Sequence, residues 1–234
     1  MIDTAPICII PARGGSKRLP RKNIIDVDGK PIIVWTIEQA IKTGVFEKVI
    51  VSTEDKIIAD TVLKWTAADV WVRPESLATD TSTVDEVCLD VLTKYENKLP
   101  KNFCCLYATS ILRSVADITE SYNMLCNEKV DSVMTITEYE QYPHQALNIN
   151  DNCEISIQWP ELLMMKRQIR PHLVVDAGSI YWANTDAFIE NKNFYCDSMK
   201  GFQVPRNRAI DVDVEEDLEI LMFYWNKNKK LNHT

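Results

Sequence analysis

The sequence predicts an α/β fold: a doubly wound, mostly parallel sheet that carries one small insertion. Short apolar runs alternate with helical stretches along the first 138 residues, which is the order of strands and crossover helices in a parallel sheet. The alternation resumes after residue 174, following a stretch that prolines interrupt. The 234 residues are 46% hydrophobic and 26% charged, a composition typical of a globular protein with a substantial core.

The first strand, loop and helix lie within residues 7–44. Residues 7–10 form a continuous apolar run that ends at Pro11, as in a strand buried on both faces of a sheet. A loop follows, and a helix begins near Pro31, a residue suited to a first helical turn, and ends at Gly44. The apolar face of this helix recurs every four residues, at Ile33, Ile37 and Ile41.

The order of strand and then helix repeats along the next hundred residues. Residues 48–53 predict a second buried strand and residues 56–67 a second helix with one apolar face. Residues 103–107 and 132–137 predict further strands, separated by a helix over residues 115–127. Such alternation implies a parallel sheet with right-handed crossovers.

Residues 139–174 break the regular alternation and predict an insertion. Two short strands, over residues 146–149 and 155–158, are joined by an Asn-Asp-Asn turn and indicate a hairpin. A strand over residues 179–182 and an amphipathic helix over residues 214–227 then close the main domain. We therefore divide the chain into an α/β domain of residues 1–138 and 175–234 and a hairpin-bearing insertion of residues 139–174.

The amino-acid composition limits which partners the protein is expected to bind and in which cell compartment it is expected to occur. With 26 Lys and Arg against 34 Asp and Glu, the net charge is −8, which argues against binding the phosphate backbone of nucleic acid. The seven cysteines are odd in number and contain no C-x-x-C pair, which predicts reduced thiols in a cytoplasmic protein. No apolar stretch approaches the roughly 20 residues that span a bilayer, so we expect no membrane association.

The loop after the first strand reverses the charge of the chain as a whole. Residues 11–23 contain five basic residues and no acidic one. The Gly14-Gly15 pair lets the backbone turn tightly, Arg13 offers a planar fork and Lys17 a point charge, which together suit a di- or triphosphate. The loop matches neither G-x-x-x-x-G-K-[ST] nor G-x-G-x-x-G. The alternative interpretation is a solvated basic surface loop.

Residues 211–219 are the acidic counterpart, with six acidic residues and no basic one. One interpretation is helix N-terminal charge, with Asp213 as N-cap. The other is a magnesium site, because Asp211 and Asp213 at positions i and i+2 of an extended segment point to the same side. We accept both and assign the carboxylates from Glu215 onward to the first helical turn.

Several ordered motifs identify a family resemblance over nearly the whole chain. They are residues 10–17, 22–23, 29–31, 49–53, 73–78, 107–113, 176–181 and 211–213. These motifs resemble the cytidylyltransferases that activate nonulosonic acids, namely the CMP-sialic acid synthetases and their pseudaminic and legionaminic relatives. The resemblance implies a Rossmann-like nucleotidyltransferase fold and a magnesium-dependent reaction, in which the anomeric hydroxyl of the sugar attacks the α-phosphate of CTP and pyrophosphate leaves.

The resemblance also assigns roles to residues of this chain. The catalytic candidates are Arg13, Lys17 and Asp211, and the metal ligands are Asp211 and Asp213. The positions that match the family's nucleotide site are Arg13, Gly14, Gly15, Ser16, Lys17, Asn23 and Arg73.

Two departures from the sialic acid synthetases bear on the sugar. Where those enzymes carry Gln-Pro and Asn-Gly, this chain has Tyr107-Ala108 and Ala177-Gly178, which resemble the pseudaminic acid enzymes. Pseudaminic acid is therefore the favoured substrate, with legionaminic and N-acetylneuraminic acid as alternatives. The candidate sugar contacts, each of which could instead be structural, are Tyr107, Thr109, Gln168, Arg170 and Tyr181.

The resemblance predicts a homodimer, because the matching insertion in the family exchanges between subunits. The apolar residues of this insertion would be hard to bury in a small hairpin alone. Two rival functions remain open: a nucleotidyltransferase acting on Kdo or on a sugar 1-phosphate, and a catalytically silent nucleotide-binding protein. The Gly-Gly-Ser-Lys sequence disfavours a Kdo enzyme, and the presence of Lys17, Asp211 and Asp213 together disfavours a silent protein.

Overall fold

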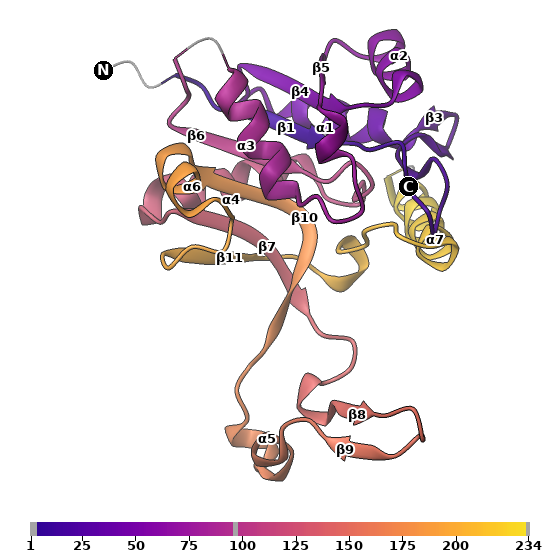
Figure 1. Cartoon of the computed structure of the whole chain (residues 1–234), viewed down its shortest axis with the longest axis vertical. Helices are drawn as coiled ribbons and strands as arrows, with labels where there is room; N and C mark the ends of the chain where they lie inside the picture. The colour runs from indigo at the N-terminus through magenta and orange to yellow at the C-terminus, as the bar shows by residue number, and fades with distance from the viewer. Residues whose placement is uncertain (1–3, 96–97, 233–234) are drawn as a thin grey trace.

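The computed structural model describes residues 4–95 and 98–232 and contains a seven-stranded central sheet (Figure 1). The strand order is β11-β7-β10-β6-β1-β4-β5. Neighbouring strands are parallel except for β10, which runs antiparallel to both β6 and β7. The predicted mostly parallel sheet is therefore confirmed. The strands are β1 (Ile7–Pro11), β4 (Lys48–Thr53), β5 (Asp69–Val72), β6 (Asn102–Leu106), β7 (Ser132–Glu138), β10 (Val174–Asn184) and β11 (Met199–Gln203).

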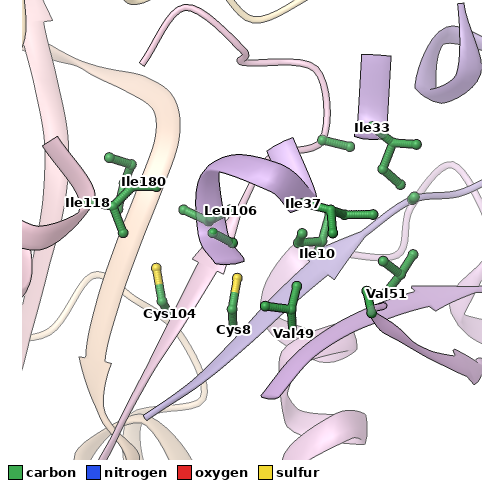
Figure 2. Close-up of a cluster of buried hydrophobic side chains, with 14 of the residues drawn as sticks. Cys8, Ile10, Ile33, Ile37, Val49, Val51, Cys104, Leu106, Ile118 and Ile180 are labelled. Atoms are coloured by element: carbon green, nitrogen blue, oxygen red, sulfur yellow. The ribbon is translucent and has the colours of Figure 1, made fainter. Parts of the chain in front are cut away.

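Helices cover both faces of this sheet, as in a doubly wound fold. They are α1 (Ile32–Thr43), α2 (Lys56–Trp65), α3 (Val84–Lys94), α4 (Val115–Glu128) and α6 (Thr185–Asn191). The last helix, α7 (Glu215–Asn232), packs outside these two layers. Alternate residues of β1 show the two faces: Cys8 and Ile10 pack with α1, α2 and α4, whereas Ile7 and Ile9 pack with α3 and α6. Figure 2 shows the first of these two clusters. Both faces of β1 are thus closed to solvent, which explains its unbroken apolar run.

A third cluster joins α7 to the rest of the domain. Leu221 of α7 and Val212 just before it are buried against Leu19 in the loop after β1 and Ile32 of α1. The ring of Trp225 lies edge-on to that of Trp35, with 4.7 Å between centroids. This packing brings the acidic run, near the end of the chain, against the basic loop near its beginning.

The insertion extends away from the sheet between β7 and β10 (Figure 1). It contains the hairpin of β8 (Leu147–Ile149) and β9 (Ile155–Ile157), followed by α5 (Pro160–Met164). A second small hairpin, β2 (Asp26–Val27) and β3 (Lys30–Pro31), precedes α1. None of the helices in the described residues is long and apolar enough to cross a membrane.

Candidate active site

A cavity of about 290 Å³ opens beyond the carboxyl ends of β1, β5 and β6. In open α/β sheets this is the edge at which ligands bind. The cavity gathers predicted site residues from five separate parts of the chain: Arg13, Asn23, Arg73, Tyr107, Thr109, Asp211 and Asp213. The loop between β5 and α3 closes another side with Asp80, Ser82 and Thr83.

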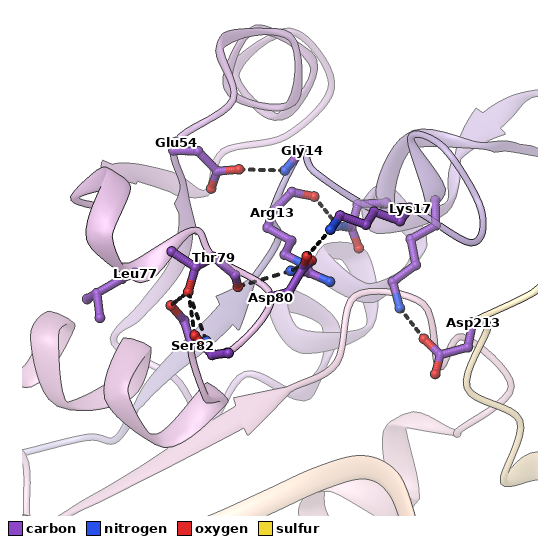
Figure 3. A network of polar contacts seen from close by, with 12 residues as sticks. Arg13, Gly14, Lys17, Glu54, Leu77, Thr79, Asp80, Ser82 and Asp213 are labelled. Atoms are coloured by element: carbon purple, nitrogen blue, oxygen red, sulfur yellow. Dashed lines mark hydrogen bonds and ion pairs between the residues drawn. The ribbon is translucent and has the colours of Figure 1, made fainter.

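Asp80 holds the two cations that were expected to bind phosphates (Figure 3). Arg13 Nη1 donates to Asp80 Oδ1 at 2.9 Å and to the Thr79 carbonyl oxygen at 3.0 Å. The Lys17 ammonium, on a side chain that is 80% exposed, forms an ion pair with the other oxygen of Asp80. Hydrogen bonds from Lys17 and Arg13 lower the pKa of Asp80. Sequence reasoning missed Asp80.

Asp213 holds two further cations of the basic loop, Lys22 and Arg18. Lys22 Nζ donates to Asp213 Oδ1 at 2.7 Å and to the Val212 carbonyl oxygen at 3.1 Å, and Arg18 Nη2 donates to Asp213 Oδ2 at 2.7 Å. Burial alone would raise the pKa of Asp213, but the hydrogen bond from Lys22 and the charges of Lys22 and Arg18 hold it below its ordinary value.

Asp213 was also considered as the N-cap of the last helix, but α7 begins at Glu215, two residues after Asp213, so Asp213 does not cap it. The Asp217 carboxylate accepts the backbone N–H groups of Asp213 and Val214, at 2.9 and 3.0 Å. The Asp213 side chain is therefore available to the cations of the loop. The two interpretations of the acidic run apply to different carboxylates.

Asp211 lies deeper in the cavity and has no direct cation partner within the described residues. Its Oδ1 accepts a 2.5 Å hydrogen bond from Thr109 Oγ1. Burial raises the pKa of Asp211, an effect that the Thr109 hydrogen bond and the Lys22 charge only partly oppose. Gly178, with a φ of +58°, approaches this carboxylate closely: a Cβ there would lie 3.7 Å from Asp211 Oδ2.

The two glycines of the basic loop differ in what they contact. The Gly14 N–H donates to Glu54 Oε1 at 2.7 Å, so it is engaged by a protein carboxylate. A Cβ on Gly14 would lie 2.2 Å from Asp55 Oδ2, whereas a Cβ on Gly15 would have no atom within 4 Å. The buried Asn23 amide donates to the Arg13 carbonyl oxygen at 2.8 Å and so fixes the backbone of the loop. Ser16 contributes a backbone N–H bond to Gly14.

Gly14→Ala is expected to destabilise the protein, because its methyl group would displace the Asp55 side chain. Asp55 is the N-cap of α2 and accepts the N–H groups of Ile57 and Ile58. Loss of such a cap costs about 1 kcal/mol, which lowers Tm by roughly 2 to 4 °C in a chain of this size. Thermal unfolding measures the shift, and Gly15→Ala is the matched control. Equal Tm values for both variants would contradict the predicted crowding at Gly14.

Arg73 lines the cavity, but it also ties structural segments together. Its guanidinium is buried and donates to the Ser52 carbonyl oxygen at the end of β4 and, at 3.4 Å, to that of Leu77. Its Nε lies 3.6 Å from Glu54 Oε2. Burial lowers the pKa of Arg73, while the charge of Glu54 opposes that shift.

Tyr107 lines the cavity, whereas Tyr181, another predicted sugar contact, is not among the lining residues. The Tyr107 and Tyr181 rings pack with 5.1 Å between centroids, and burial raises the pKa of both phenols. Tyr181 and Tyr195 donate their hydroxyls to Asp176 at 2.8 and 2.7 Å. Burial, aided by that hydrogen bond, raises the pKa of Tyr195 to about 12. Sequence reasoning missed Tyr195, because only the fold brings it beside the Asp176 motif.

Gln168 and Arg170, two predicted sugar contacts, are not among the residues that line this cavity. Both lie in the insertion, where Gln168 is exposed. Arg170 donates to the carbonyl oxygens of Leu163 and Met165, at 2.7 and 3.0 Å, and lines a separate cavity of about 510 Å³. A larger cavity of about 880 Å³ between β7, β10 and α7 contains no predicted site residue.

The donor set beside the basic loop fits a magnesium ion shared with a ligand. The described residues contain no cluster of three or more His, Cys, Asp or Glu that could hold a metal alone. Magnesium in phosphate-transfer sites is typically held by one or two carboxylates together with substrate phosphates. Asp211 and Asp213 supply such carboxylates, and among the described residues no donor reaches Asp211 Oδ2.

Several known proteins are similar to this chain over most of its length. A family model described as Cytidylyltransferase matches residues 7–229. A pseudaminic acid cytidylyltransferase from Campylobacter jejuni is 32% identical over 230 residues, covering 97% of both chains. A CMP-N,N'-diacetyllegionaminic acid synthase from Legionella pneumophila is 33% identical over 219 residues, covering 90% of this chain and 92% of that protein. A CMP-2-keto-3-deoxy-manno-octonic acid synthetase solved in complex with CTP superposes with a TM-score of 0.72, over 96% of this chain and all of that one. At 18% identity, this last likeness bears on the fold alone.

Proposed function

This chain belongs to the cytidylyltransferase family, and from that membership we infer that it transfers CMP from CTP to the anomeric hydroxyl of a nonulosonic acid. The enzyme has a Rossmann-like nucleotidyltransferase fold and releases pyrophosphate. One observation carries the assignment of the cavity: a basic loop and an acidic pair, about 190 residues apart in sequence, meet at the carboxyl edge of the sheet.

The basic loop is proposed to bind the triphosphate. Nucleotidyl transfer depends mainly on positioning and on neutralising phosphate charge, and Lys17 and Arg13 bring two cations to one side of the cavity. Lys17 is exposed enough to follow a phosphate, whereas Asn23 and the buried Arg73 hold the backbone around it. These four residues, with the backbone of residues 14–16, constitute the proposed nucleotide site.

Asp211 and Asp213 are proposed to hold magnesium opposite that loop. A magnesium ion bound there would neutralise charge that develops on the transferred phosphate. The Thr109 hydroxyl donates to one oxygen of Asp211 and so fixes the orientation of the carboxylate. The second oxygen would then be presented to the metal. The cations Lys22 and Arg18 orient Asp213 and keep it ionised.

Pseudaminic acid is proposed as the acceptor. The support is the Campylobacter relative of that name and the presence of Tyr107 and Ala177 where sialic acid synthetases carry amide-bearing residues. Both positions adjoin Asp211: Tyr107 lines the cavity and Ala177 precedes Gly178. At these two positions the cavity wall therefore has one aromatic and one small side chain, where a sialic acid enzyme has hydrogen-bonding amides. Such a wall suits a less polar sugar.

The acceptor is tested by measuring pyrophosphate release from CTP and magnesium with equal concentrations of four acids. The acids are pseudaminic, legionaminic, N-acetylneuraminic and Kdo. We expect kcat/KM to be at least about tenfold higher for pseudaminic acid than for the others, the discrimination that one or two polar contacts typically give. A preference for another acid would contradict the proposed acceptor, and no release with any of them would contradict the proposed reaction.

A homodimer built on the insertion is also proposed. Several of its large apolar side chains are exposed in the single chain, including Met164 at 79% and Ile149 and Ile169 at 69% each. Apolar surface of this extent is characteristic of an interface. A second subunit would also give Gln168 and Arg170 a route to an active site that they do not reach within their own chain. Light scattering at micromolar concentration is expected to give twice the 26.9 kDa chain mass, and a monomer would contradict the proposal.

A cytoplasmic location is proposed on the state of the cysteines. All seven are free thiols, and five of them are buried. Disulfides are rare in the reducing cytoplasm, so an unpaired set of this size suits that compartment.

A further inference from the structure

The Asp80 carboxylate pairs with Arg13 and Lys17, the two cations to which the proposed function assigns phosphate oxygens. We propose that Asp80 is an internal stand-in for phosphate, which holds Arg13 and Lys17 in the empty enzyme and is exchanged for the triphosphate of CTP. This inference rests on the proposed nucleotide role of the basic loop. It adds a gate: the triphosphate must displace a carboxylate before it can bind.

Geometry supports a stand-in rather than an incidental surface pair. The two oxygens of Asp80 are divided between two cations, with Arg13 on one and Lys17 on the other. A phosphate group presents oxygen acceptors to the same two donors, and neither cation can bind both anions fully at once. Arg13 and Asp80 line the one cavity, and Lys17 reaches it through its ion pair with Asp80, so the exchange needs no larger movement of the fold.

The Asp80 turn has hydrogen bonds of its own, in addition to the one that the Thr79 carbonyl oxygen accepts from Arg13. Thr79 Oγ1 lies 2.7 Å from Ser82 Oγ, the Ser82 N–H donates to Thr79 Oγ1 at 3.2 Å, and Ser82 Oγ donates to the Ser76 carbonyl oxygen at 3.1 Å. The reciprocal capping bonds of Thr83 and Glu86 fix the start of α3 directly afterward. The carboxylate therefore stays nearby when the cations turn to a ligand, ready to take them back.

The exchange is selective for highly charged ligands. The Asp80 and Lys17 side chains are 46% and 80% exposed, so their ion pair is screened by water and is easily broken. A triphosphate or pyrophosphate offers many charged oxygens and competes successfully, whereas a ligand without phosphates gains nothing from displacing Asp80. When pyrophosphate leaves, the return of Asp80 to Arg13 and Lys17 speeds its release.

The test compares the wild-type chain with Asp80→Asn, which keeps the shape and removes the charge. Calorimetry measures the binding of inorganic pyrophosphate, CTP and cytidine in the presence of magnesium and without acceptor sugar. We expect Asp80→Asn to bind pyrophosphate and CTP about 3- to 10-fold more tightly and cytidine equally well, with the gain shrinking at 0.5 M salt. In turnover the KM for CTP falls while kcat does not rise. Asp60→Asn, an exposed position on α2 outside the cavity, is the matched control.

The other outcomes are distinct. Unchanged or weaker binding of pyrophosphate by Asp80→Asn overturns the exchange, and a parallel loss of kcat would indicate that Asp80 serves the reaction directly. Equal tightening of cytidine would overturn it as well, since cytidine carries no phosphate. Wild-type protein that binds pyrophosphate but not CTP overturns the proposed function, and the pyrophosphate comparison still decides the exchange. If the wild type binds neither ligand, both proposals fail.

Discussion

Lys17→Ala is expected to lower kcat for CMP-sugar formation by about two to three orders of magnitude while leaving the fold intact. Removing one preorganised donor from a site that stabilises developing charge typically costs that much. The Lys17 side chain is 80% exposed and its described ion pair is with Asp80, so little stability depends on it. Steady-state kcat at saturating CTP and sugar, with Tm as the measure of folding, checks the prediction.

The matched control for Lys17 is Lys56→Ala, an exposed lysine at the start of α2 that does not line the cavity. This control separates the local effect from the loss of one positive charge in an acidic protein. A Lys17→Ala enzyme with kcat within about threefold of the wild type would remove Lys17 from the reaction.

Asp211→Asn is expected to abolish nearly all turnover without destabilising the protein. The amide cannot serve as an anionic ligand, and loss of metal-assisted charge stabilisation costs several kcal/mol, or about 10³-fold or more in kcat. Asn still offers an oxygen to the Thr109 hydroxyl, so the local hydrogen bond survives. Residual turnover should respond only weakly to added magnesium.

The stability of Asp211→Asn follows from the raised pKa of Asp211. The Asp211 carboxyl group binds its proton more tightly in the folded protein than in the unfolded chain. Its ionised form at neutral pH therefore lowers the free energy of unfolding. That cost appears as the pH rises from the ordinary Asp value through the folded pKa. Asp211→Asn lacks it, and its Tm at pH 7 should equal or exceed that of the wild type. Glu216→Gln, in the exposed first turn of α7, is the control; a lower Tm for Asp211→Asn alone would contradict the account.

Strands buried on both faces could be predicted from the sequence, because burial makes them continuous apolar runs. The predicted bounds of residues 48–53 match β4, and residues 7–10 match β1 to within one residue. The edge strands β5 and β11 were missed, since β11 has mostly exposed residues and no apolar run. The antiparallel direction of β10 depends on the insertion, which returns the chain to the sheet from the carboxyl end of β7.

Helix boundaries were predictable where local chemistry set them. α1 ends at Gly44, which adopts the expected left-handed conformation at a φ of +67°. α3 was missed, although its capping residues Thr83 and Glu86 stand at the spacing of a capping box. The last helix extends to Asn232 rather than Lys227, because its polar end lacks the apolar pattern that was used to find it.

The candidate site was predictable in its residue types and less so in its contacts. The charge of the basic loop and of the acidic run is visible in the sequence, and the fold brings Lys22 to Asp213. The ion pairs of Asp80 with Arg13 and Lys17 join residues more than 60 positions apart in the sequence. They form because the loop after β5 brings Asp80 next to the basic loop. No local sequence pattern predicts that these residues lie close together in the fold.

A crystal structure of the enzyme with CTP and magnesium tests the central claim most directly, because three cavities compete for the nucleotide. The account predicts the triphosphate in the 290 Å³ cavity, within hydrogen-bond distance of Arg13 and Lys17, with the metal at Asp211 and Asp213 and Asp80 turned away from both cations. A triphosphate bound instead in the 510 or 880 Å³ cavity, beside Arg206 and away from the basic loop, would contradict it.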